Sequence, residues 1–129
     1  MKNSLYQQFK KKGYNFFVGV PCSGIKEFIS EIEQDSEHVY IPATKEDSAL
    51  GIAVGAYFAG KKPLVFLQSS GLGNLVNGIT SLLKPYNIRI HFLISLRKTP
   101  FEHEFMYKVF YKLLKDLEYG EYVTIIEEK

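Results

Sequence analysis

The sequence has little cysteine and no marked excess of either charge. Its single cysteine, Cys22, excludes an intrachain disulfide and a zinc site built from several cysteines. Sixteen basic and 14 acidic residues give a net charge of +2, without the strongly basic balance typical of nucleic-acid-binding proteins. The lysines at 10–12 and 61–62 form two short runs, which we expect to be solvated.

Long apolar runs are missing as well. None approaches the ~20 residues that a membrane-spanning helix needs. The first residues, "MKNSLYQQFKKKGYNFF", lack the apolar stretch of a secretion signal. We therefore expect a soluble cytoplasmic protein that binds neither nucleic acid nor membrane.

Several common catalytic motifs are absent. The segment "GLGN" at 71–74 lacks both the GK[ST] of a P-loop and the third glycine of GxGxxG, and no HExxH occurs. The three histidines are far apart in the sequence. We expect His91, inside a predicted strand, to be structural, whereas His103 could face the loops at one edge of the fold. Cys22 has no base near it in the sequence, so little favours a role as nucleophile.

Aromatic residues, by contrast, are abundant. The chain has ten phenylalanines and nine tyrosines, although it has no tryptophan. A self-contained domain of this size would expose few of them, so their number indicates a surface for a partner.

Apolar segments alternate between strand-like and helix-like patterns along the chain. Strands are predicted at 15–20, 38–43, 63–68, 88–95 and 122–128. Helices are predicted at 3–12, 23–34, 45–60, 74–84 and 101–118, the last with Phe101, Phe105, Val109, Leu113 and Leu117 along one side. Because strands that alternate with helices form parallel sheets covered on both faces, we predict a single α/β domain over residues 1–129 with a doubly wound parallel sheet.

Polar loops follow four of the predicted strands. They read "PCSG" (21–24), "TKED" (44–47), "QSSGLGN" (68–74) and "LRKT" (96–99). Ligands of such sheets bind beyond the carboxyl ends of the strands, so we expect these loops to meet at one edge. The segment 68–74 has two interpretations: a tight strand-to-helix turn, or a loop whose glycines admit a ligand to the backbone.

Glu46 stands at the start of the predicted helix 45–60. The helix dipole favours a carboxylate there, which would explain Glu46 and Asp47 equally well. The same helix is thin, because it carries Gly51, Ala53, Gly55, Ala56 and Ala59. These small residues allow either close packing on the sheet or the close approach of another chain.

Three segments resemble the thiamine-diphosphate-dependent decarboxylases of sulfopyruvate and phosphonopyruvate. They read "GVPCSGIKEFI", "PATKEDSALGIAVGAYFAGKKPLVFLQSSGLGNLVNGITSLLKPYNI" and "LISLR". The resemblance covers roughly residues 15–97 and is to the family's pyrimidine-binding domain. Cys22 and the segment "GAYFAGKKP" look more like the alpha chain of the sulfopyruvate enzyme.

The resemblance implies a catalytic role for Glu46. In the family, a glutamate at this place contacts N1′ of the aminopyrimidine and stabilises its imino tautomer, whose 4′ nitrogen then removes the thiazolium C2 proton. The implied cofactor-binding residues are Glu46, Ser70, Gly71, Leu72, Gly73 and Asn74. The implied substrate-binding residues are Cys22, Ser23, Gln68 and Arg97, and the Arg97 guanidinium suits a sulfonate or phosphonate.

The sequence departs from the family pattern at three positions. Ser69 replaces an asparagine, Leu96 replaces an aromatic residue or a histidine, and Lys98 replaces a glycine. The diphosphate-binding domain, with its GDG signature, is also absent. The resemblance therefore implies a hetero-oligomer in which a partner beta subunit grips the diphosphate and Mg²⁺, with no metal ligand on this chain.

We predict the alpha subunit of a carboxy-lyase that uses thiamine diphosphate and is active only with its partner. Its substrate would be an anionic 3-substituted pyruvate, either sulfopyruvate or phosphonopyruvate. The departures at Ser69, Leu96 and Lys98 motivate a second hypothesis, a non-catalytic scaffold or regulatory subunit of the same fold. A third hypothesis is a flavodoxin-like domain that would bind flavin or nucleotide without a partner.

Overall fold

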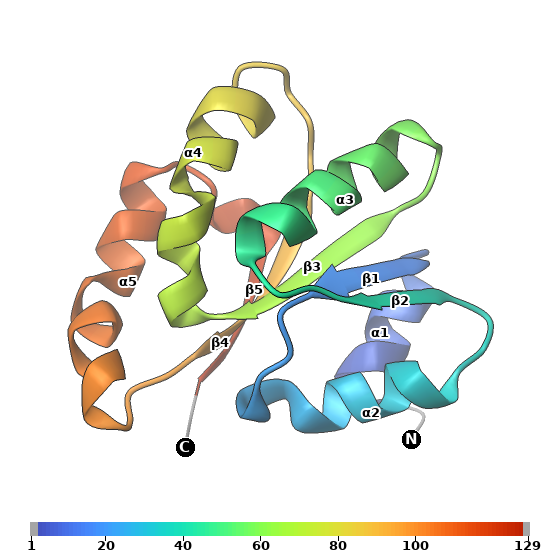
Figure 1. Ribbon diagram of the computed structural model, residues 1–129, viewed down its shortest axis with the longest axis horizontal. Coiled ribbons are helices and arrows are strands. Elements are labelled where there is room, and N and C mark those ends of the chain that lie inside the picture. The colour runs from blue at the N-terminus through green and yellow to red at the C-terminus, as the bar shows by residue number, and fades with distance from the viewer. Residues whose placement is uncertain (1–2, 128–129) are drawn as a thin grey trace.

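Five parallel strands form the centre of the computed structural model, which describes residues 3–127. Their order across the sheet is β2-β1-β3-β4-β5 (Figure 1). The predicted α/β class and parallel sheet are confirmed. The strands are β1 (Phe16–Gly19), β2 (Val39–Pro42), β3 (Pro63–Gln68), β4 (His91–Leu96) and β5 (Val123–Glu127). The last strand was predicted to reach residue 128, which lies outside the described residues.

Helical segments connect these strands. On one side of the sheet lie α1 (Leu5–Lys11) and α2 (Lys26–Gln34), the latter preceded by the 3-10 turn η1 (Ser23–Ile25). The other side is covered by longer stretches of helix. These are α3 (Glu46–Phe58), the run η2 (Ser69–Leu75), α4 (Val76–Gly78) and η3 (Ile79–Leu83), and the run η4 (Phe101–His103) and α5 (Glu104–Asp116), with η5 (Gly120–Tyr122) before β5.

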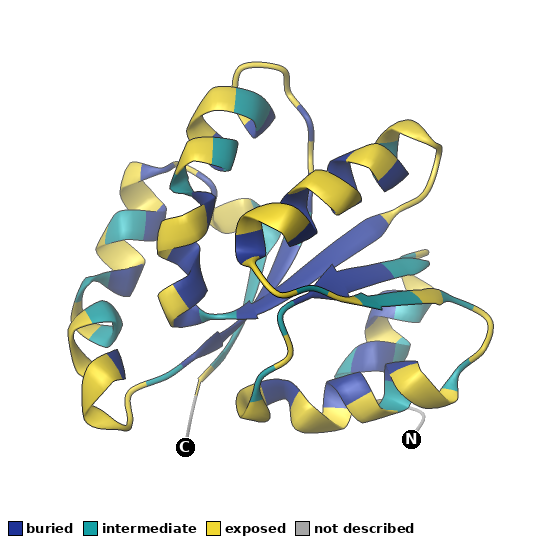
Figure 2. Cartoon of the chain, viewed as in Figure 1, coloured by how far each residue is buried: buried dark blue, intermediate teal, exposed yellow. Residues whose placement is uncertain are grey.

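Each face of the sheet has its own apolar core, and the central strands are buried between the two (Figure 2). β3 reads "PLVFLQ" and is buried from Pro63 to Leu67, as a strand covered on both faces should be. β2 and β5 are only partly buried because they are the two edges of the sheet.

The register brings the carboxyl ends of the strands to one edge. Gly19 is level with Pro42 and Phe66, and Gln68 is level with Ser95. The chain leaves β1 and β3 for opposite faces of the sheet, so their carboxyl ends form the topological switch point, the usual ligand position for this strand order. The loops after β1, β2, β3 and β4 therefore border one region, as predicted.

The predicted helix 74–84 is wrong at its start and in its form. Helical structure begins at Ser69, immediately after β3, as a 3-10 turn, and its last turn is a π-helix over Ile79–Leu83. The glycine-rich segment is therefore not an open loop. Its compact turns place Leu72 and Leu75, both fully buried, in the core.

The predicted apolar side of the segment 101–118 is only partly right. Phe101 and Phe105 are exposed to 84% and 74%, whereas His103, Phe110 and Leu114 are buried. The first three residues form a 3-10 turn rather than α-helix, which rotates the phenylalanines away from the sheet. The abundance of aromatic residues is thus accounted for partly by an exposed set: Phe58, Tyr86, Phe101, Phe105 and Tyr111. None of the helices within residues 3–127 combines the length and the hydropathy that a membrane span requires.

Candidate functional site

Glu46 is the only carboxylate among the buried polar residues of the described chain. It is the first residue of α3, and its 9% exposure sets it apart from its neighbour Asp47, which is exposed. The start of α3 follows the carboxyl end of β2, so Glu46 lies at the loop edge of the sheet. Burial of a carboxylate is costly unless hydrogen bonds compensate for the lost water, so the contacts of Glu46 are of interest.

Gly71 leaves the room that the Glu46 side chain occupies. A Cβ atom at position 71 would lie 2.6 Å from Cγ, Cδ and Oε2 of Glu46, which is closer than real Cβ contacts. The bare backbone of η2 therefore rests directly against the carboxylate. A glycine is required at 71 for this close approach rather than for an unusual backbone angle.

Asn74 holds one oxygen of the Glu46 carboxylate. Its Nδ2 donates a hydrogen bond of 2.8 Å to Oε1. In the described part of the chain, no donor contacts the other oxygen, Oε2. The carboxylate is thus fixed on one side and available on the other.

Arg97 stands just beyond β4 and is tied to the end of β3. Its Nη1 donates to Oε1 of Gln68 at 3.3 Å, and its backbone N–H donates to Oγ of Ser69 at 3.0 Å. Ser69 is fully buried. Two neighbouring strand ends thereby fix the base of the guanidinium side chain. No sequence pattern indicated this contact, because Ser69 was noted only as a departure from a family pattern.

The loop after β1 packs onto the end of β4. A Cβ at Gly24 would overlap Oγ of Ser95, a buried residue, so the two segments touch. Cys22 is half-buried, and burial raises the pKa of its thiol; the nearby charge of Arg97 lowers it and that of Glu46 raises it. Ser23 is exposed at the start of η1. Cys22 is therefore within electrostatic reach of both Glu46 and Arg97.

The remaining residues of the glycine-rich segment differ in exposure. Ser70 and Gly73 face outward, while Leu72 is buried in the core under α3. Of the predicted cofactor-binding residues, Glu46, Gly71 and Asn74 are brought into mutual contact. Leu72 contributes packing beneath them.

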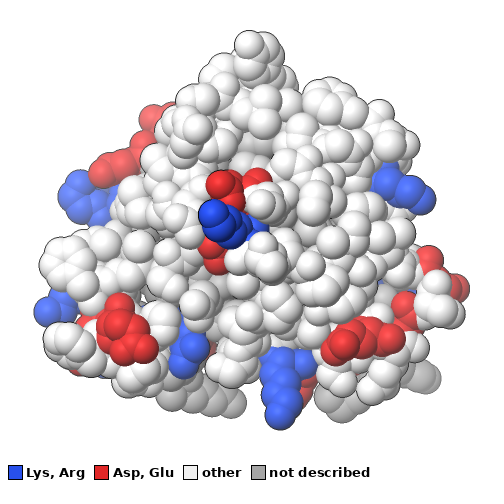
Figure 3. All heavy atoms as spheres, viewed as in Figure 1, with Lys and Arg blue, Asp and Glu red and all other residues white. Residues whose placement is uncertain are grey.

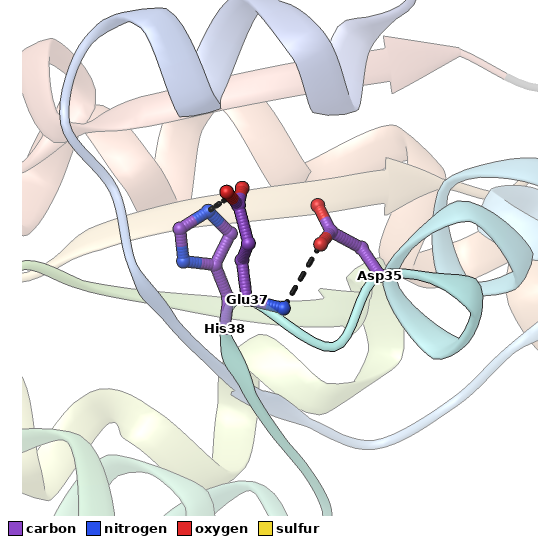
Figure 4. Close-up of side chains that lie close together, drawn as sticks. All are labelled: Asp35, Glu37 and His38. Carbon is purple, nitrogen blue, oxygen red and sulfur yellow. Dashed lines mark hydrogen bonds and ion pairs between the residues drawn. The ribbon is translucent and has the colours of Figure 1, made fainter.

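A separate acidic cluster lies at the other end of α2. Asp35, Glu37 and His38 bring ligand-type atoms within 4.8 Å of one another (Figure 4). The ammonium of Lys10 is 2.7 Å from Asp35 and 3.0 Å from Glu37. Because Lys10 already supplies a cation to both carboxylates, the cluster is explained as an ion-pair network that joins α1 to α2.

The two histidines considered from the sequence are placed differently. His91 lies in β4 with Nε2 2.7 Å from Oγ1 of Thr124, a structural contact, as expected. His103 is buried in η4, and its Nδ1 has no hydrogen-bond partner among residues 3–127.

Several curated proteins are similar to this chain in sequence. Sulfopyruvate decarboxylase subunit alpha of Methanocaldococcus jannaschii is 42% identical over 94 residues, which are 73% of this chain and 56% of that protein. The same subunit of Methanothermobacter thermautotrophicus is 38% identical over 103 residues, or 80% and 61% of the two chains. Phosphonopyruvate decarboxylase of Streptomyces viridochromogenes is 35% identical over 92 residues, or 71% and 23%. The chain thus spans little more than half the length of the alpha subunits that it matches.

The fold also occurs among solved structures. One example is a 2-oxoglutarate:ferredoxin oxidoreductase from Magnetococcus marinus, which superposes with a TM-score of 0.54 over 68% of this chain and 16% of its own. The two sequences are 18% identical, so the likeness concerns the backbone architecture alone.

The family to which this chain belongs follows from a sequence match over most of its length. Residues 1–98 match the family described as thiamine pyrophosphate enzyme, N-terminal TPP binding domain. The matched range contains all the strand ends around Glu46 and reaches Arg97. The chain therefore belongs to the thiamine pyrophosphate enzyme family, as an N-terminal TPP-binding domain.

Proposed function

We propose that this chain is the alpha subunit of a thiamine-diphosphate-dependent decarboxylase acting on an anionic 3-substituted pyruvate, sulfopyruvate or phosphonopyruvate. One observation carries the proposal. A buried carboxylate, Glu46, has one oxygen held by Asn74 and the other unpartnered within the described chain, beside the bare backbone of Gly71. The similarity to decarboxylases named for these two substrates supports the substrate class.

The residues present suit the aminopyrimidine end of the cofactor. Oε2 of Glu46 would share a proton with a ring nitrogen, and Asn74 would keep the carboxylate oriented through Oε1. The absence of a side chain at Gly71 would let a flat ring come close to that oxygen. When bound, thiamine diphosphate supplies an electron sink for the decarboxylation of a 2-oxo acid.

Arg97 would receive the acid group at C3 of the substrate. A guanidinium offers paired donors that match a sulfonate or phosphonate. Its contacts to Gln68 and to Oγ of Ser69 would limit its freedom before the substrate binds, which lowers the entropy cost of binding. Cys22 and Ser23, on the loop after β1, would border the same region.

A partner subunit would complete the site by holding the diphosphate and Mg²⁺. The outer face of α3 supports a partner, because Gly51 and Gly55 are exposed there and a Cβ on either would meet no atom within 4 Å. On the face shown in Figure 3, charged side chains gather near the start of α3 and are sparse over the rest of α3 and over α4. Phe58 and Tyr86 are exposed to 72% and 71% beside this face. The proposed contact with the partner subunit is therefore the thin, apolar outer face of α3.

The test is a pair of matched substitutions at neighbouring carboxylates, Glu46→Gln and Asp47→Asn. Each would be purified with the diphosphate-binding partner and assayed for CO₂ release from sulfopyruvate and from phosphonopyruvate. The amide oxygen introduced by Glu46→Gln would still accept the hydrogen bond from Asn74, so the loss is confined to proton sharing. We expect turnover to fall by about 10²–10⁴-fold for Glu46→Gln and to stay within about threefold for Asp47→Asn.

Two results would count against the proposal. Turnover of Glu46→Gln within about threefold of the unsubstituted pair would remove Glu46 from the chemistry. A wild-type pair that assembles but releases CO₂ from neither substrate would favour the non-catalytic scaffold instead. Melting curves of both variants would show that the fold is retained.

A further inference from the structure

A cavity lies at the edge of the sheet opposite to Glu46, where the strands begin. Its volume is about 310 Å³, at the lower end of the roughly 300–1,000 Å³ typical of small-molecule sites. The residues that line it adjoin the amino ends of β1, β3, β4 and β5, except for Tyr57, which lies in α3. They are Tyr14, Tyr57, Lys61, Lys62, Pro63, Arg89, His91 and Tyr122. Because the strands are parallel, this edge is remote from the one that carries Glu46.

The lining has three cations and no acid. Neither the Lys61 nor the Arg89 side chain makes a hydrogen bond or ion pair with any residue in 3–127. Lys62 Nζ donates to the carbonyl of Lys12 at 2.6 Å and lies 4.3 Å from the centre of the Tyr14 ring. One of the two lysine runs that we expected to be solvated, Lys61 and Lys62, thus lines a hollow that has no carboxylate in its lining within the described chain.

Aromatic rings form the walls of the cavity. Tyr14, Tyr57 and Tyr122 line it together with the imidazole of His91, whose centre is 5.8 Å from that of the Tyr14 ring. Burial, and then the charges of Lys12 and Lys62, lower the pKa of His91 to about 4, so its ring is neutral at physiological pH. Neutral planar rings offer surfaces on which a flat ligand can stack.

We propose that this cavity binds a small organic phosphate with a planar ring, of the size of a nucleoside monophosphate. A phosphate monoester carries a charge of about −1.5 to −2 near pH 7, which suits the cations at Lys61, Lys62 and Arg89. Arg89 can engage two phosphate oxygens at once. The planar ring accounts for the tyrosines, which a simple ion would not need. This site is independent of the proposed decarboxylase activity.

The experiment titrates the whole chain with the four common nucleoside monophosphates and follows the His91 ring signals by NMR. Adenosine and inorganic phosphate serve as probes that lack the charge and the ring, respectively. We expect at least one nucleotide to bind saturably, and each partial probe to bind at least tenfold more weakly. The bound anion should also raise the pKa of His91, since it favours the protonated ring.

A matched pair of double variants tests the position of the site. Lys61→Ala with Arg89→Ala removes two charges from the cavity, whereas Lys108→Ala with Lys115→Ala removes two exposed charges from α5. We expect at least tenfold weaker binding for the first and less than twofold change for the second. The proposal is overturned if no nucleotide saturates the chain by about 5 mM, above the ~1 mM of a weak small-molecule site. It is also overturned if phosphate alone binds equally well, or if both double variants weaken binding alike.

Discussion

At the residue scale, the central contact is between Glu46 and position 71. The carboxylate is buried because a glycine leaves it space, and it is oriented because Asn74 donates to Oε1. Of these relations, the placement at strand ends could be predicted from the sequence, since parallel strands bring their following loops to one edge. The contacts themselves could not be predicted, because they depend on the tight 3-10 turns of η2.

Substitution of Gly71 by alanine should displace the acid. The new Cβ would lie 2.6 Å from three atoms of Glu46, so the carboxylate or the turn must shift. We expect turnover of the chain assembled with its proposed partner to fall by about 100-fold, the typical result of a misplacement of about an ångström. Gly73→Ala is the control, because its Cβ would meet nothing within 4 Å. Equal activities of the two variants would show that Glu46 need not rest on the backbone of η2.

His91 should make the stability of the fold depend on pH. Its pKa of about 4 in the folded chain is lower than the 6.5 of an unperturbed histidine. As the pH falls from 6.5 to 4, the unfolded chain therefore binds a proton that the folded chain does not, and the free energy of unfolding decreases. We expect His91→Gln to flatten this part of the curve in urea titrations at several pH values. An unchanged slope would contradict the burial of a neutral imidazole.

At the scale of elements, the sequence predicted which segments are strands and helices better than it predicted the form of the helices. The strand patterns were clear because β3 and β4 are nearly continuous apolar runs. The segment 69–83 was harder, since its 3-10 and π turns follow from packing against α3. In particular, a Cβ at Gly78 would overlap Leu50, so the two helical segments touch there.

The apolar side of α5 was misjudged for a related reason. A regular helix starting at Phe101 would align Phe101 and Phe105 with the core, but η4 comes first and shifts the face. The buried side is instead set by Phe110 and Leu114. A change of turn type at a helix start is not visible in apolar periodicity.

Substitution of a glycine on the outer face of α3 should raise the stability of the isolated chain and weaken its binding to the partner. Gly55→Ala should raise the stability of the isolated chain by about 0.8–1.0 kcal/mol, because alanine favours the helix and the added Cβ meets no atom. The same methyl group should weaken association with the partner if that face is the contact. We expect a higher melting temperature together with at least tenfold weaker binding in a titration of partner into the chain.

Gly78→Ala provides the contrast. It is the same substitution in another helical segment, but the new Cβ would overlap Leu50, a buried side chain. We expect a lower melting temperature for this variant. Unchanged partner binding by Gly55→Ala would contradict the proposed contact at α3. The partner surface would then have to lie elsewhere, for example around Phe101 and Phe105.

At the scale of the whole molecule, the parallel sheet has two chemically different ends. The carboxyl ends of the strands gather a buried acid, Glu46, and the guanidinium of Arg97. The amino ends gather the cations and tyrosines of the cavity that Lys61, Lys62 and Arg89 line. Ligands at the two ends would contact different loops, so either site can be removed by substitution while the other is measured.

Under the proposed function, the position of α3 would link assembly to chemistry. Its first residue is the acid, and further along its backbone lies bare toward the outside at Gly51 and Gly55. A neighbouring helix seated on that bare stretch could come nearer than the usual separation of about 8–10 Å between axes. If a docked helix displaced α3, the carboxyl group would move with it, because this group belongs to the first residue of the same continuous helix. Binding of the partner subunit would then also position Oε2 of Glu46, the oxygen proposed to share a proton.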